Sequence, residues 1–148
     1  MILSRRNFLM AALVPPALGQ DPAAKPKPQA PVLPTSALSY DQLPVRITST
    51  GGESRAILKG QLATGEELEM HHTSLQAGKM PHAGHRHVYA EVWLLREGTV
   101  EFTANDKSTR LGPGSVAYVS SNDFHSIKNV GDTVAHYFVL AIGPGAYR

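Results

Sequence analysis

The chain of 148 residues contains no cysteine. It therefore forms no disulfide bonds, has no thiol nucleophile and offers no ligands for a cysteine-bound iron–sulfur cluster. A lipid anchor of the bacterial lipoprotein type is excluded as well, because that anchor requires a cysteine at its cleavage site.

Long apolar runs are also lacking. The apolar stretch at residues 8–18 has about half the ~20 residues that a membrane-spanning helix needs, and Pro15 and Pro16 interrupt it. We expect no stable membrane span after processing, with a retained N-terminal anchor as the alternative.

A surplus of one charge is absent too. The formal charge of +2 comes from 14 basic and 12 acidic residues, and Arg5 and Arg6 belong to a segment that we expect to be removed. No cluster of lysine and arginine with interleaved aromatic residues is present, so we predict no nucleic-acid partner. With no internal repeat and 42% hydrophobic residues, the chain can supply one core.

The N-terminus resembles an export signal. Ser4 to Leu9 read Ser-Arg-Arg-Asn-Phe-Leu, which resembles the twin-arginine signature, and small residues at 17 and 19 suit a signal peptidase. We predict a signal peptide at residues 1–19 and a periplasmic or otherwise exported protein. The proline-rich residues 20–36 are predicted to be a disordered linker, and residues 37–148 the folded domain.

No segment after residue 40 sustains a helical period. Short alternating or apolar runs, separated by turn formers such as Gly112-Pro113-Gly114, instead predict an all-β sandwich or barrel. The predicted strands are 45–49, 54–60, 67–76, 89–95, 99–104, 107–111, 115–119, 124–128 and 133–142.

Histidines gather in the middle of the chain, and His85, His87 and Glu91 form the densest group. Alternate residues of an extended chain point to the same side, so these three can converge if the strand continues. Two imidazoles and a carboxylate at one point indicate a metal site. A polar strand with its histidines facing water is the alternative.

Residues 78–98, together with residues 114–129, resemble the paired motifs of the cupin family. The first stretch has His85-x-His87, three residues, Glu91, six residues and Gly98, and the second has Gly114, His125 and Asn129 at the family's spacing. The second stretch departs from the family pattern, because Ser120 and Asn122 replace a proline and a glycine. Asparagine tolerates the left-handed conformation that such a turn glycine supplies.

The resemblance implies a single-domain cupin-like jelly-roll β-barrel. It implies one divalent transition metal (Mn, Fe, Ni, Co, Cu or Zn) held by His85, His87, Glu91 and His125. The first three would lie on one strand and its approach, with His125 facing them from a later strand across the interior. No organic cofactor is predicted.

Four further residues are weighed individually. His71 and His72 are adjacent in a predicted strand, so one faces inward, and we name His72 as a catalytic candidate beside Glu91. His82 is a second candidate, at the mouth of the site. For each histidine a plain hydrogen-bonded role is the alternative. Trp93 is expected to pack in the core, with an aromatic wall for a planar ligand as the alternative.

The functional hypothesis is a metal-dependent oxidoreductase of dioxygenase type that acts on a small organic substrate in the periplasm. The resemblance leaves decarboxylases, isomerases and hydrolases open. A non-catalytic module that binds a metal or a small molecule is the alternative from another class. A homodimer is a possible assembly.

Overall fold

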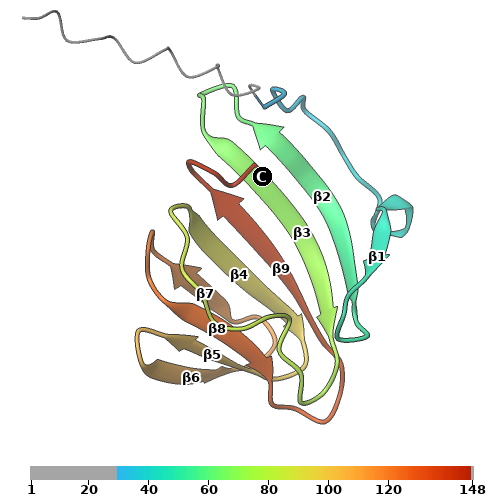
Figure 1. Ribbon diagram of the computed structural model, residues 1–148. Coiled ribbons are helices and arrows are strands. Elements are labelled where there is room, and N and C mark those ends of the chain that lie inside the picture. Colours follow the sequence, from blue (N-terminus) through green and yellow to red (C-terminus); the bar gives the residue numbers. More distant parts are fainter. Residues whose placement is uncertain (1–29, 148) are drawn as a thin grey trace, which may run out of the picture.

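The computed structural model describes residues 30–147 (Figure 1). The predicted signal peptide, residues 1–19, and the first part of the predicted linker, residues 20–29, lie outside the described residues. Within residues 30–147, no helix has the length and apolar character that a membrane crossing requires.

Nine strands and one short 3₁₀ helix make up the described chain, and every strand pairing is antiparallel. A six-stranded sheet has the order β1-β2-β3-β9-β4-β7, and a three-stranded sheet has the order β6-β5-β8. The elements are η1 (Tyr40–Gln42), β1 (Val45–Ile47), β2 (Glu53–Gln61), β3 (Glu67–Leu75), β4 (Ala90–Glu97), β5 (Val100–Ala104), β6 (Lys107–Leu111), β7 (Val116–Val119), β8 (His125–Asn129) and β9 (Ala135–Ile142). The predicted all-β jelly-roll is confirmed, and each predicted run overlaps one strand, with ends that differ by up to two residues for most strands.

The core lies between the two sheets. Strand β9 alternates buried and half-buried residues along its whole length, as expected for a strand with one face on a core. We call the side of the six-stranded sheet that turns toward the smaller sheet its inner face, and the opposite side its outer face. The core residues are Leu75, Trp93, Leu95, Val100, Phe102, Ala117, Val119, Ile127, Ala135, Tyr137 and Val139.

Gly98, the closing glycine of the first motif, forms the turn between β4 and β5. Its φ is 84°, in the left-handed region. A Cβ atom at this position would lie 2.7 Å from the Cα atom of Ala135. The turn therefore requires glycine for both its conformation and its space.

The ordered N-terminal contacts begin before the expected boundary at residue 37. Leu33 donates its N–H to the Gln61 carbonyl, and Gln61 donates its own to the Pro31 carbonyl, at 2.8 Å each. Residues 31–33 thus add a short parallel contact to the end of β2. The segment then continues to β1 past η1, as Figure 1 shows.

Candidate metal centre

His85 and His87 lie on the approach to β4, and Glu91 lies on the strand itself. His85 and His125, the first residue of β8, exchange two backbone hydrogen bonds of 3.0 Å. The two residues are therefore neighbours in an isolated antiparallel bridge. His125 is thus beside His85 rather than across the interior from it, whereas it faces Glu91 of the six-stranded sheet from the three-stranded sheet.

The turn of the second motif holds the approach in place. Asn122 has a φ of 64°, the left-handed conformation expected of a residue that replaces a glycine. Its N–H bonds to the His87 carbonyl at 2.7 Å, and its carbonyl accepts a hydrogen bond from Arg86. Ser121 donates to the Val88 carbonyl on the same approach. The two motifs are thus joined by their backbones.

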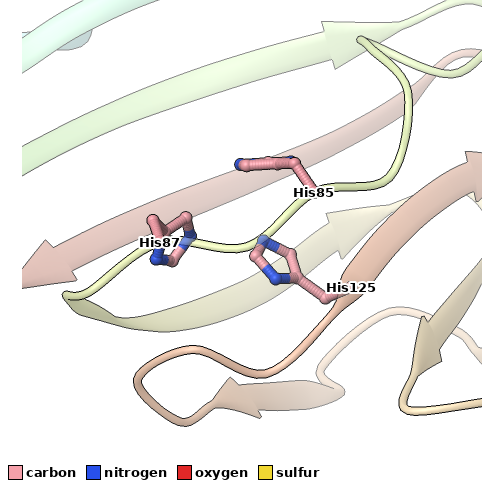
Figure 2. Close-up of side chains that lie close together, drawn as sticks. All are labelled: His85, His87 and His125. Atoms are coloured by element: carbon pink, nitrogen blue, oxygen red, sulfur yellow. The ribbon is translucent and has the colours of Figure 1, made fainter.

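Three imidazoles converge at this junction (Figure 2). One ring nitrogen from each of His85, His87 and His125 lies within 4.8 Å of the other two. The side chain of His125 is fully buried, and that of His87 is 8% exposed. Such a cluster of nitrogen donors is suited to a divalent transition metal.

Backbone carbonyls orient two of these rings. The Nδ1 of His87 lies 2.7 Å from the Tyr89 carbonyl, and the Nδ1 of His125 lies 3.0 Å from the Asp123 carbonyl. A carbonyl only accepts, so each Nδ1 carries the proton and each Nε2 presents a lone pair. This is the arrangement by which carbonyl groups orient metal-binding histidines.

The ring nitrogens at the centre lack partners. Nε2 of His87, Nε2 of His125 and Nδ1 of His85 are buried and make no hydrogen bond. Buried polar atoms are nearly always paired, so three unpaired nitrogens at one place need an explanation. A divalent metal ion accepts lone pairs from nitrogen atoms, so one bound ion would provide the missing partner of all three.

Glu91 adds a carboxylate to the cluster. Its two oxygens lie 3.4 Å from Nε2 of His87 and 3.4 Å from Nε2 of His125, beyond normal hydrogen-bond length. The indole N–H of Trp93 donates to Glu91 Oε2 at 2.9 Å. Burial acts to raise the pKa of Glu91, but His125 and the Trp93 N–H outweigh it and hold the pKa below its ordinary value. The group is therefore a carboxylate at neutral pH.

The imidazoles themselves have shifted pKa values. Burial, together with the neighbouring rings of His82, His125 and His87, lowers the pKa of His85. For His125, burial acts in the same direction, but the Glu91 carboxylate and the Asp123 carbonyl raise its pKa overall. The carboxylate thus compensates for positive charge at the cluster, whether that charge is a proton or a metal.

Trp93 packs in the core as expected. Its ring stacks on Tyr137 with centroids 5.4 Å apart and meets the edge of Phe102. Its hydrogen bond to Glu91 was not foreseen in the sequence, although the shared parity of residues 91 and 93 could have suggested it. Tyr89, which stacks on His87 at 3.7 Å, was also missed.

His72 does not belong to this site, contrary to the expectation. It is 1% exposed and lies on the outer face, beneath the Tyr40 hydroxyl at 3.3 Å and stacked on His136. Its register partner on β9 is Phe138, whereas the neighbouring His71 pairs with the core residue Val139. The sheet therefore separates His72 from Glu91, and His71 is the inward member of the pair.

His82 and Asn129 differ most in their exposure. His82 is exposed, and its ring meets that of His85 edge-on at 4.5 Å, so it lies beside the cluster. Asn129 is fully buried, and its amide donates to the carbonyls of Leu75 and Thr133 at 2.8 Å. Asn129 therefore fixes the turn that follows β8.

Comparison with known proteins agrees with the fold. Residues 71–142 match the family model of the cupin domain, a span that contains all four predicted ligands. A comparison with curated protein sequences found no match.

Three solved structures illustrate the likeness. An RmlC-like cupin from Shewanella frigidimarina is 15% identical, with a TM-score of 0.62 over 75% of this chain and 94% of that one. A predicted oxalate decarboxylase from Thermotoga maritima is 20% identical, with a TM-score of 0.59 over 74% of this chain and 100% of that one. The polyketide cyclase RemF from Streptomyces resistomycificus is 12% identical, with a TM-score of 0.58 over 73% and 79%.

At these identities the structural likeness establishes the fold and carries no information about the reaction. The family match covers residues 71–142, and the solved structures share the jelly-roll fold, so this chain is similar to cupins in that span and has their fold.

Proposed function

We propose that the protein is a mononuclear metal enzyme that acts on a small organic substrate. The observation that carries the proposal is the set of three buried, unpaired imidazole nitrogens beside the Glu91 carboxylate. His85, His87, His125 and Glu91 would hold one divalent ion from the group Mn, Fe, Co, Ni, Cu and Zn. Donor type alone does not select among these metals.

A bound metal would supply a Lewis acid for a substrate oxygen and, if it is redox-active, a centre for chemistry with O₂. The chain contributes three neutral imidazoles and one anionic carboxylate, which together hold the ion and offset one unit of its charge. Four protein donors leave room for a small ligand when the ion takes five or six. Glu91 is also the carboxylate nearest to that ligand and can accept its proton.

The specific form of the proposal is a dioxygenase-like oxidoreductase that acts on a small diol, enol or aromatic compound in the periplasm. A donor set of several histidines and one carboxylate is compatible with non-haem iron, which supports this form. Export rests on the Arg5-Arg6 signature alone. A homodimer and the absence of a nucleic-acid partner stay predictions from the sequence.

The test is O₂ uptake by the purified protein, with its metal content measured first, against a panel of diols, phenols and diketones. Glu91→Gln keeps the shape of the side chain and removes its charge. We expect turnover per bound metal to fall by about 10²-fold, the scale for losing a general base. The control is His136→Ala, which alters a histidine on the outer face.

One result would reject the enzyme proposal, and another would reject only the role given to Glu91. Metal-loaded protein that consumes no O₂ and converts none of the panel would instead indicate a binding module. Metal-loaded Glu91→Gln that turns over substrate like the wild type would reduce Glu91 to a ligand without a role in proton transfer.

A further inference from the structure

A second pair of ionisable side chains lies on the inner face of the six-stranded sheet. Glu69 and His71 are two residues apart on β3, so their side chains share one face. The Nδ1 of His71 lies 3.0 Å and 2.9 Å from the two carboxylate oxygens of Glu69. Both side chains remain accessible, at 28% exposure for His71 and 23% for Glu69.

The strand register relates this pair to the metal centre. Glu69 and Glu91 are both register partners of Ala141, one from each side of β9, while His71 and Trp93 are both partners of Val139. Cross-strand partners point to the same face, and strands lie ~4.8 Å apart. The Cα atoms of Glu69 and Glu91 are therefore about 10 Å apart.

The surface between them is small and mostly apolar. In the row from Glu69 to Glu91 the intervening side chain is the methyl group of Ala141. On the other side of His71, its partner on β2 is Ala56, which is exposed. The side chains of the inner face between the metal centre and the Glu69–His71 pair are thus small or aliphatic, namely Ala141 and Val139.

The pair is arranged for hydrogen bonding to a ligand. Because the Glu69 carboxylate accepts from Nδ1–H, the neutral ring of His71 presents a lone pair at Nε2. This Nε2 is not among the buried unpaired nitrogens, and no described residue bonds to it. A hydroxyl group, which can donate to this atom, is the matching ligand group.

We propose that His71, oriented by Glu69, is the second anchor of the substrate, and that the substrate is a small hydroxy acid or a similar molecule with two oxygen functions. One oxygen function would bind at the metal centre, and a hydroxyl a few bonds away would donate to Nε2 of His71. The inference rests on the proposed metal site and adds the class of substrate that this site accepts.

An ordinary ion pair on the surface makes a different prediction. Exposed ion pairs contribute ~0–1 kcal/mol to stability, and removing one leaves ligand preference unchanged. The two explanations therefore differ in ligand selectivity rather than in stability.

The test uses the full chain loaded with Co²⁺, whose visible absorption reports ligand binding. The probes are two matched pairs, namely 3-hydroxypropionate with propionate and 4-hydroxybutyrate with butyrate. One hydrogen bond contributes roughly 0.5–1.5 kcal/mol, so the wild type should bind at least one hydroxy acid about 3- to 10-fold more tightly than its deoxy partner.

Variants assign this preference to the pair. In His71→Leu the ratio of the two affinities, hydroxy acid over deoxy acid, should fall to about 1, while the deoxy acid binds as before. His71→Gln should restore part of it, and the matched control His136→Leu, on the outer face of β9, should retain it. Cobalt content should be the same in all four proteins, because His71 is not a ligand.

The failures can be told apart. A wild-type protein that takes up no Co²⁺ would reject the proposed metal site itself. Cobalt-loaded wild type with equal affinity for both members of each pair would overturn the inference, as would a preference that survives His71→Leu. Loss of cobalt in His71→Leu would also overturn it.

A second readout needs no metal. In metal-free protein, ¹⁵N shifts of the neutral form of His71 should show the proton on Nδ1 rather than on Nε2. Glu69→Gln should weaken this preference for the Nδ1–H form. The opposite tautomer in the wild type would contradict the orientation on which the inference depends.

Discussion

Acid should destabilise the protein through His72. Burial and the positive charges of His136, Arg96 and Arg55 lower the pKa of this imidazole from 6.5 to about 4. The unfolded chain takes up a proton near pH 6.5, whereas the folded chain resists it until about pH 4. Stability is therefore complete above pH 6.5 and is lost as the pH falls toward 4.

The size of the effect follows from the two pKa values. The full loss of unfolding free energy is about 3 kcal/mol below pH 4, and about 2 kcal/mol is already lost at pH 5. The ring is 1% exposed, so solvent screening reduces this value little. Other groups titrate in the same range, and a variant is needed to isolate the contribution of His72.

His72→Phe provides that comparison, because phenylalanine keeps a ring against Phe138 and His136 but does not titrate. Urea unfolding of the metal-free wild type and variant at pH 8 and pH 5 measures how much unfolding free energy each protein loses between these two pH values. The wild type should lose about 2 kcal/mol more than the variant over this interval. Equal losses in the two proteins would refute the burial of a neutral imidazole at this position.

Three further predictions concern other parts of the chain. Arg5→Lys with Arg6→Lys should keep the protein in the cytoplasm, and unchanged processed protein in the periplasm would contradict the export signal. Trp93→Phe removes the N–H bonded to Glu91 and should lower the unfolding free energy by about 1.5–3 kcal/mol, the range for bonds to charged groups, as measured by chemical denaturation; a loss under 0.5 kcal/mol would argue against that bond. Gly98→Ala should destabilise by at least ~1 kcal/mol, because the turn has positive φ and no space for a Cβ; an unchanged melting temperature would show that the turn relaxes.

The strands and the convergence of His85 with His87 could be predicted from the sequence because both depend on local patterns. Alternation and turn residues marked each strand, and the His85-x-His87 spacing fixed which side chains share a face. The bridge between His85 and His125 could not be predicted in the same way. It joins segments 40 residues apart, and only the packing of one sheet over the other decides which residues meet.

The wrong choice between His71 and His72 has a physical cause. Strand β3 is buried on both faces near its end, where Thr73, Ser74 and Leu75 are all covered. The outer face is covered in part by Tyr40 from the N-terminal segment, which has no recognisable signal in the sequence. Because apolar character does not distinguish the two faces there, the phase of the strand could not be fixed.

The contacts of residues 31–33 with β2 were not predicted, for a related reason. Proline density between residues 20 and 36 indicated an extended chain, which is also the conformation needed to lie beside a strand. Pro31 contributes its carbonyl to Gln61 and needs no N–H for that contact. Composition therefore did not indicate the partner of residues 31–33.

The most direct test of the metal centre is elemental analysis of the purified wild type beside His87→Ala and His136→Ala. We expect about one transition metal per chain in the wild type and in His136→Ala, and little in His87→Ala. Metal should also raise the melting temperature of the wild type, because a thousandfold excess over Kd adds about 4 kcal/mol to the unfolding free energy. Equal metal in the wild type and His87→Ala would contradict the assignment of the ligands.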